Sequence, residues 1–216
     1  MAKSNRTKLS KTKSAKARSA TQARVLSSRL AYEGPVFSVT TDEVEEPGGV
    51  RARRDVIRHS GSIVILAVDR SSASKKSASK KPATQKSEPR ILLEHQYRHA
   101  AQSMMWELPA GRIDEGESAL AAGKRELIEE TGYRAKKWKQ ILFFYVSPGF
   151  LDETMTIYLA EDLTLGEAEP EADERIEAKF VSLSKAKKMA LDGTIRDAKT
   201  ISGIFWLVQN PHPSRG

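Results

Sequence analysis

Apolar and polar residues and two turn signals along the first part of the folded chain predict a series of short β-strands. Residues 29–39 predict two strands separated by a turn at Gly34-Pro35. A second turn follows at residues 46–49, and a charged, edge-like strand is predicted over residues 50–58. The chain is therefore expected to begin its folded part with a small meander of strands.

Later strands are more apolar and are expected to lie inside the protein. The β-branched runs over residues 62–68 and 90–97 are typical of buried strands. Residues 71–89, between them, are rich in Ser, Lys and Ala and are interpreted as a lengthened hairpin loop, because closure entropy grows only slowly with loop length. Further strands are predicted over residues 140–146 and 154–160.

Three helices complete the predicted fold. The strongest covers residues 118–131, with Ser118 as a candidate N-cap and Gly132 at its end. Two more helices are predicted over residues 185–191 and 197–209. Strands flanked by helices indicate an α/β (α+β) sandwich built on a mixed sheet. In the last helix, apolar residues recur with helical spacing at Ile201, Ile204, Phe205 and Val208.

The helix over residues 118–131 has two chemically different sides at 100° per residue. We expect the first side to pack against the sheet; it contains Leu120, Ala121, Lys124, Leu127 and Ile128. The opposite side carries three carboxylates within one turn, those of Glu126, Glu129 and Glu130.

The net charge of +8 arises from two segments of low complexity. Residues 1–32 contain nine Lys or Arg and no acid, and residues 71–89 add five Lys and one Glu, so the rest of the chain carries about −5. We predict a disordered basic tail over residues 1–26, one domain over residues 27–210 with its first strands at 27–58, and a short tail over residues 211–216.

Composition excludes several classes of function. Without cysteine there is no disulfide, thiolate zinc site or cysteine nucleophile, and the four histidines lack zinc-ligand spacing. No apolar run approaches the roughly 18 residues of a membrane span, and none follows the basic start as a secretory signal requires, so a cytoplasmic location is expected. An organelle transit peptide and phosphate contacts to nucleic acid remain alternatives for the basic segments, with a solubilising tail favoured.

The clustered glutamates indicate a metal site. Like charges one helical turn apart repel by a few tenths of a kcal/mol, and a merely solvated face would alternate Glu with Lys. Hard divalent cations require such oxygen ligands and leave positions for water and phosphate. Gly111 and Gly116 bracket a tight loop before the helix, and Glu117 adds a further carboxylate.

This segment resembles the Nudix box, G-x5-E-x7-R-E-U-x-E-E-x-G-U, where U is a bulky apolar residue. A match at so many fixed offsets is specific, and only Tyr133, at the last U position, is loose. The matching residues are Gly111, Glu117, Arg125, Glu126, Leu127, Glu129, Glu130, Gly132 and Tyr133.

Other segments over roughly residues 27–209 resemble the ADP-ribose/ADP-sugar pyrophosphatase branch of the Nudix hydrolase superfamily. That branch is marked by a proline about fifteen residues beyond the box, where Pro148 stands. The resemblance does not extend to the basic tail or to residues 71–89. The matching segments are residues 32–37, 54–57, 96–98, 106–111 and 147–150.

The resemblance implies a role for each box residue. Glu126 and Glu130 would bind Mg²⁺ or Mn²⁺ together with the carbonyl of Ala110, and Glu129 would add a ligand or position water. The bound cations would clamp a diphosphate and activate a water for in-line attack. The remaining box residues would orient the site: Gly111, Glu117, Arg125 and Gly132.

The resemblance also implies residues on the substrate side. Arg54 and Arg98 resemble phosphate- and ribose-side contacts, with Glu107 and Phe37 beside the pocket. The catalytic base often comes from a late acidic loop, here residues 166–177, and Glu174 is our prediction for it.

The leading hypothesis is hydrolysis of ADP-ribose, or a related ADP-sugar, to AMP and a sugar phosphate. The enzyme alternatives are a GDP-sugar, a dinucleoside polyphosphate or an oxidised nucleotide as substrate. A non-catalytic nucleotide- or RNA-binding module is the alternative of another class. The resemblance further implies a homodimer in which the N-terminal strands cross to the partner's pocket.

Overall fold

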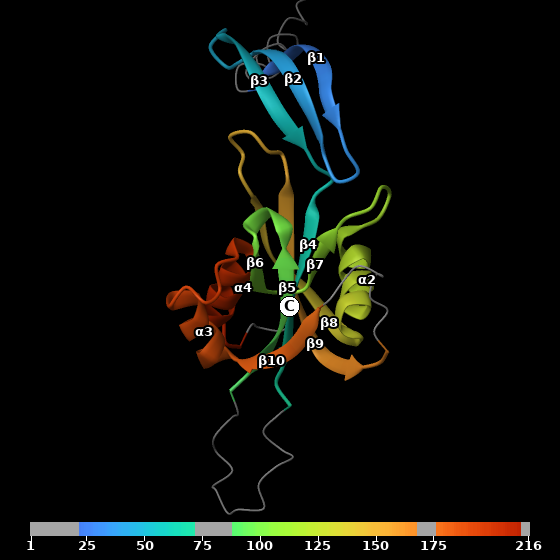
Figure 1. Ribbon diagram of the computed structural model, residues 1–216, viewed down its shortest axis with the longest axis vertical. Coiled ribbons are helices and arrows are strands. Elements are labelled where there is room, and N and C mark those ends of the chain that lie inside the picture. The colour runs from blue at the N-terminus through green and yellow to red at the C-terminus, as the bar shows by residue number, and fades with distance from the viewer. Residues whose placement is uncertain (1–21, 72–87, 168–175, 213–216) are drawn as a thin grey trace, which may run out of the picture. The chain divides into compact units, whose positions relative to one another are not determined.

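The computed structural model describes residues 22–71, 88–167 and 176–212 (Figure 1). Its contacts divide the chain into two compact units. The described part of the first unit comprises residues 22–59 and 145–153, and that of the second comprises residues 60–71, 88–144, 154–167 and 176–212. Most of the predicted basic tail and of the 71–89 insertion lies outside the described residues, and the first strand begins three residues before the boundary expected at residue 27.

The first unit is an antiparallel sheet of β1 (Arg24–Glu33), β2 (Ser38–Glu45) and β3 (Arg51–Arg58), in that order. The N–H of Gly34 donates to the carbonyl of Phe37 over 3.0 Å and closes the β1–β2 turn. β1 is exposed along its whole length. The predicted meander is confirmed, and the charged third strand lies at an edge of its sheet.

The loop that carries Pro148 also belongs to the first unit, because it is bonded to β3. The N–H of Ile57 donates to the carbonyl of Phe150 over 2.8 Å, and the N–H of Asp152 donates to the carbonyl of Ile57 over 3.1 Å. Arg58 adds an ion pair with Asp152 at 3.1 Å. Residues distant in sequence are thus joined as neighbouring extended segments.

The second unit is built on a mixed sheet whose described part has the order β10-β5-β4-β9-β8, with β6 beside β5 and β7 beside β4. The central pair β4–β9 is parallel, whereas β5 pairs antiparallel with β4, β6 and β10. Val68 pairs with Ile91, so the predicted hairpin around the 71–89 insertion is confirmed. The strands are β4 (Ser62–Asp69), β5 (Arg90–Arg98), β6 (Ser103–Glu107), β7 (Ala110–Arg112), β8 (Tyr133–Tyr145), β9 (Thr154–Leu165) and β10 (Glu177–Ser182).

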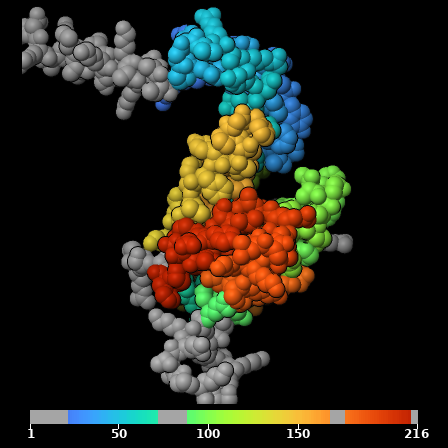
Figure 2. All heavy atoms as spheres, turned by 90° about the vertical axis from the view of Figure 1, so that its left-hand side faces the viewer, coloured from blue at the N-terminus to red at the C-terminus, as the bar shows by residue number. Residues whose placement is uncertain are grey.

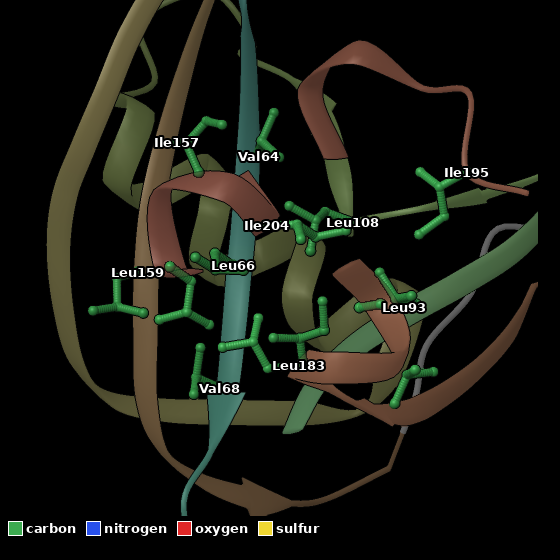
Figure 3. Close-up of a cluster of buried hydrophobic side chains, with 14 of the residues drawn as sticks. Val64, Leu66, Val68, Leu93, Leu108, Ile157, Leu159, Leu183, Ile195 and Ile204 are labelled. Atoms are coloured by element: carbon green, nitrogen blue, oxygen red, sulfur yellow. The ribbon is translucent and has the colours of Figure 1, made fainter. Parts of the chain in front are cut away.

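Helices cover both faces of this sheet, and the alternating side chains of β4 form the core on each side. Val64, Leu66 and Val68 pack towards α3 (Leu183–Leu191) and α4 (Ala198–Gln209), as Figure 3 shows. Ile65 and Ala67 pack towards α2 (Ala119–Thr131). The C-terminal segment covers the face of this unit that is turned to the viewer in Figure 2. The predicted α/β sandwich is confirmed.

Polar caps define where the helices begin and end. The side chains of Ser118, Ser182 and Asp197 each accept a hydrogen bond from the N–H three residues later, which satisfies an N–H that the helix leaves unbonded. Gly132 ends α2 in the left-handed region, with φ 72°, where glycine carries no steric cost. Among the described residues no helix is long and apolar enough to cross a membrane.

The structure corrects the predicted helix faces. Ala121 and Lys124 were expected at the sheet but are exposed, and the inner surface of α2 contains Gly123, Leu127 and Glu130. The carboxylates therefore do not lie opposite the core. Because Ala122 and Gly123 are small, the helix comes close to the sheet and its glutamates turn partly inward. In α4 the buried face is also rotated from the predicted one, and its buried residues are Lys199, Thr200, Gly203, Ile204 and Leu207.

Some strands were missed. The sequence did not predict the short strands β6 and β7, because neither has an alternating pattern of its own. They form by pairing with β5 and β4, respectively. β8 begins at Tyr133, seven residues before the predicted start, because its first half is a lysine-rich edge strand. Charged residues are common on such edges, where they oppose pairing with another chain.

We expect Leu66→Ala to lower the free energy of unfolding by about 2–5 kcal/mol, because it leaves a cavity at a fully buried position of β4. Leu191→Ala is the matched control, since Leu191 is 67% exposed, and it should cost less than about 0.5 kcal/mol. Urea unfolding followed by circular dichroism measures both. Equal losses in the two variants would contradict the assigned core.

Candidate active site

The predicted box forms a loop and helix between β7 and β8. Gly116 takes φ 78°, a conformation that favours glycine, and the N–H of Glu117 donates to the carbonyl of Asp114 over 3.0 Å. This tight turn leads directly into the Ser118 cap of α2. The box glycines and the cap thereby fix the direction in which the glutamates of α2 leave the backbone.

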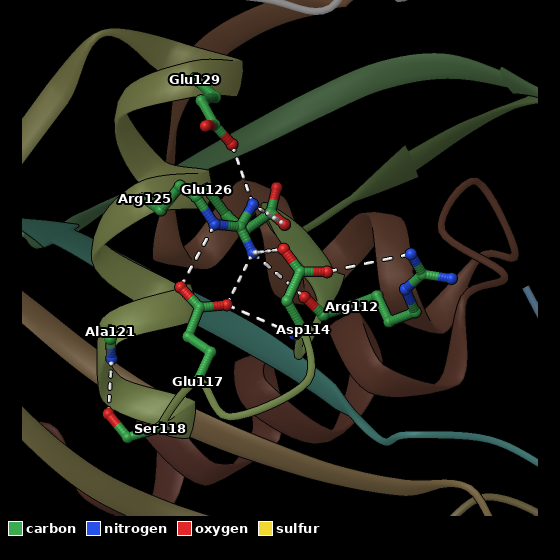
Figure 4. A network of polar contacts seen from close by, with 8 residues as sticks. All are labelled: Arg112, Asp114, Glu117, Ser118, Ala121, Arg125, Glu126 and Glu129. Carbon is green, nitrogen blue, oxygen red and sulfur yellow. Dashed lines mark hydrogen bonds and ion pairs between the residues drawn. The ribbon is translucent and has the colours of Figure 1, made fainter.

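Arg125 is the centre of a polar network within the box (Figure 4). Its guanidinium donates to Glu117 over 2.9 Å, to Glu126 over 2.7 Å and to Glu129 over 3.0 Å. It also donates to the carbonyl of Arg112 over 3.2 Å. One cation therefore compensates three carboxylates that would otherwise repel one another.

The network shifts the ionisation of its members. Hydrogen bonding to Glu117, followed by the interactions with Glu126 and Glu129, raises the pKa of Arg125 above its ordinary value. The same hydrogen bond from Arg125 lowers the pKa of Glu117. Both groups are thus held in their charged forms, and the position of the Glu117 carboxylate is fixed beside the loop.

Two glutamates of α2, Glu126 and Glu130, lie against β7. Glu130 is buried and accepts a hydrogen bond from the N–H of Ala110 over 3.1 Å. Glu126 lies directly over Gly111, where an added Cβ would come within 1.9 Å of its Oε1 atom. A side chain at position 111 would displace the Glu126 carboxylate from this place, so the predicted box glycine has a steric reason.

The donor set here fits a hard divalent cation. Glu126, Glu130 and the backbone at Ala110 supply oxygen atoms from two elements that face each other, and Gly111 leaves room for the Glu126 carboxylate. Glu129 lies on the same turn but is directed to Arg125. Within the described part of the chain, no three His, Asp or Glu side chains already form a cluster that could hold a metal ion.

Arg98 and Glu107, both predicted on the substrate side, form a bidentate ion pair. Arg98 donates through Nε to Oε1 and through Nη2 to Oε2 of Glu107, each over 2.9 Å. The Glu107 side chain is 2% exposed, whereas that of Arg98 is 41% exposed. Glu107 is therefore the buried anchor, and Arg98 is the partner that reaches the surface.

The structure adds residues at the start of α4 that the sequence analysis missed. The Lys199 ammonium donates to the same Oε2 atom of Glu107 and lies 3.1 Å from Asp197. The Thr200 hydroxyl accepts from the N–H of Leu108 over 2.8 Å. The sequence carried no signal for either residue, because neither lies on the apolar face predicted for this helix.

The three remaining predicted site residues lie in the first unit or outside the described residues. Arg54 and Phe37 belong to the first unit, where Arg54 pairs with Glu46 at 2.5 Å and Phe37 packs against Tyr32 with ring centroids 5.6 Å apart. Glu174 lies outside the described residues.

Comparison with known proteins identifies this arrangement. A model of the NUDIX domain matches residues 83–202, more than half of the chain. The chain belongs to the Nudix family. The match extends from the 71–89 insertion to α4 and contains the whole box together with Arg98, Glu107, Lys199 and Thr200.

Two relatives of this Nudix protein align over most of its length. It is 32% identical to an ADP-ribose pyrophosphatase of Bacillus subtilis, over 86% of this chain and 92% of the relative. It is 31% identical to an ADP-ribose pyrophosphatase of Mycobacterium tuberculosis, over 83% and 80%. A crystal structure of an ADP compounds hydrolase shares the fold, with a TM-score of 0.67 over 87% of this chain and 93% of that one at 20% identity.

The Glu107 ion pairs predict a pH dependence of stability. Burial would raise the pKa of Glu107, but the hydrogen bond from Arg98 and the charge of Lys199 lower it below the ordinary 4.5. The unfolded chain then binds more protons just below pH 4.5, so this contribution is present above that pH and is lost as pH falls through the lowered pKa.

We therefore expect the unfolding free energy of the wild type to fall as the pH is lowered below about 4.5, and that of Glu107→Gln to fall less over the same range. Urea unfolding at several pH values between about 6 and 3.5 measures the slopes. Parallel curves for the two proteins would show that Glu107 has the same pKa folded and unfolded.

Proposed function

We propose that this Nudix protein hydrolyses the diphosphate bond of ADP-ribose, or of a related ADP-sugar, to AMP and a sugar phosphate. The observation that carries the proposal is the complete set of box carboxylates, three of them bonded to Arg125 and Glu130 bonded to the Ala110 amide. It occurs in a chain that aligns over most of its length with proteins named ADP-ribose pyrophosphatase. A pure binding module would have no need for this self-repelling cluster.

Nudix hydrolases generally require divalent metal ions, and we propose Mg²⁺ or Mn²⁺ here. Glu126, Glu130 and the carbonyl of Ala110 would hold the cation. When bound, it would offset charge on the diphosphate and lower the pKa of a water molecule. Support comes from the facing of Glu126 and Glu130 towards β7 and from the space that Gly111 leaves.

The other residues of the site would orient the attacking water, hold the carboxylates and bind the diphosphate. Glu129 is the more exposed of the glutamates bound to Arg125, so it can accept a hydrogen bond from the attacking water and orient it. Arg125 and Glu117 keep these carboxylates in place. Arg98 offers a planar, permanently charged donor that suits phosphate oxygens. Glu174 as the base, and Arg54 and Phe37 as further contacts, remain predictions from resemblance.

We expect Glu126→Gln and Glu130→Gln each to lower kcat/KM for ADP-ribose by about a hundredfold or more, because each removes a charged oxygen ligand of the cation. Glu115→Gln is the matched control: the residue is exposed in the loop before α2 and should retain full activity. AMP release with Mg²⁺ or Mn²⁺, abolished by a chelator, is the measurement. Unchanged turnover in Glu130→Gln would refute the assigned site.

A substrate panel separates the alternatives. ADP-ribose, ADP-glucose, GDP-mannose and diadenosine polyphosphates should be compared under identical conditions, with the highest kcat/KM expected for ADP-ribose. Preference for another compound would keep the enzyme class and change the substrate. Salt-dependent RNA binding that is lost on deleting residues 1–25, with no hydrolysis of any compound, would favour a binding module instead.

We also propose that the chain forms a homodimer through its N-terminal strands. β1 is exposed on every residue, and it carries large apolar side chains such as Leu30, which is 53% exposed, and Tyr32. A three-stranded sheet with so little buried apolar area is expected to need a covering partner. A cytoplasmic location stays a prediction.

Light scattering should therefore give twice the chain mass of 24.0 kDa. Leu30→Glu should shift the protein towards the monomer, because a charge at the covered strand would have to be desolvated. Leu191→Glu, at an exposed apolar position of α3, should leave the mass unchanged. A monomeric wild type at micromolar concentration would contradict the dimer.

A further inference from the structure

Side chains in the first turn of α4 bond two consecutive residues, through the carboxylate of Glu107 and the backbone N–H of Leu108. Lys199 donates to Oε2 of Glu107, and the Thr200 hydroxyl accepts from the N–H of Leu108. Asp197 links Lys199 to Thr200: its carboxylate lies 3.1 Å from the Lys199 ammonium and accepts a hydrogen bond from the Thr200 hydroxyl over 2.6 Å. Two residues further on, Ala110 is bonded to Glu130.

The Glu107 carboxylate links Lys199 to Arg98. Both oxygens of Glu107 accept from the Arg98 guanidinium, and Oε2 also accepts from Lys199. The Lys199 side chain is 9% exposed, so its ammonium cannot reach a ligand at the surface, whereas Arg98 can. A carboxylate held by a buried lysine has little freedom to rotate, and neither has the guanidinium bonded to both of its oxygens.

The charges of this group balance. Arg98 and Lys199 contribute two positive charges, and Glu107 and Asp197 contribute two negative charges. Without the lysine the group would carry a net negative charge close to Glu130, whose field also reaches Arg98.

We propose that Lys199 is a positioning residue for substrate binding: it fixes Glu107 so that the Arg98 guanidinium is presented to the diphosphate. This inference rests on the proposed function. Because the Lys199 ammonium is buried against Glu107, we expect it to act on Arg98 through that carboxylate and not by contact with substrate or metal. Its loss should therefore weaken substrate binding more than it slows the chemical step.

Steady-state kinetics on ADP-ribose with saturating Mg²⁺ test this role. Lys199→Met should raise KM by about tenfold or more while kcat changes by less than about threefold. Lys187→Met, at an exposed position of α3, is the matched control and should leave both constants unchanged. Added to Arg98→Met, Lys199→Met should raise KM by less than about twofold, because its effect passes through Arg98.

Loss of a partner from a buried ion pair can prevent folding. If Lys199→Met does not fold, the single variant Glu107→Gln is compared with the double variant Lys199→Met/Glu107→Gln, in which both charges of the ion pair are removed. The single and the double variant should have equal KM values, because Lys199 acts through Glu107. A thermal melt confirms that each variant is folded.

Several results would overturn the inference. Effects of Lys199→Met and Arg98→Met that multiply in KM would show that the lysine acts independently of Arg98. A lower melting temperature with unchanged KM would show a purely structural role. An active wild type in which Lys199→Met equals Lys187→Met would overturn this inference alone, whereas a wild type without ADP-ribose turnover would overturn the proposed function as well.

Discussion

The backbone from Glu107 to Gly111 is held from both helical layers, and the active site depends on this constraint. Thr200 of α4 bonds the Leu108 amide on one side, and Glu130 of α2 bonds the Ala110 amide on the other. Between them, the carbonyl of Pro109 accepts from the N–H of Ile65 in the central strand β4 over 2.8 Å. The site therefore exists only when the sheet and both helices are in place.

Charge compensation is the second requirement. Carboxylates gathered for a cation repel one another, and in a partly buried place this repulsion is screened less than in water. Arg125 offsets it by bonding three of them, while Glu130 takes an amide donor. The same logic recurs at Arg98, Lys199 and Glu107, where a fully buried carboxylate is matched by two cations. The Nudix box thus contains both the carboxylates that repel one another and the arginine whose positive charge offsets that repulsion.

The two units differ in how their strands are stabilised. β4 is covered on both faces and is almost wholly buried, so its pairing is supported by side-chain packing. β1 is exposed throughout and is held mainly by hydrogen bonds to β2. The loop with Pro148 belongs to the first unit because its backbone continues the hydrogen bonding of β3. This difference is the physical basis for expecting a partner at the N-terminal sheet.

The sequence by itself determined the features that depend on short spacings. The box residues, the Ser118 cap, the Gly132 end and the buried runs of β4 and β5 follow from local sterics and periodicity, and they predicted the family and the sandwich. Tertiary structure decided which side of α2 faces the sheet, because small residues at 122 and 123 permit a close approach that an average helical wheel does not contain. It also decided the roles of Lys199 and Thr200, since their partners Glu107 and Leu108 each lie 92 residues away in the sequence. Contacts of that range depend on how the layers pack, which no local pattern specifies.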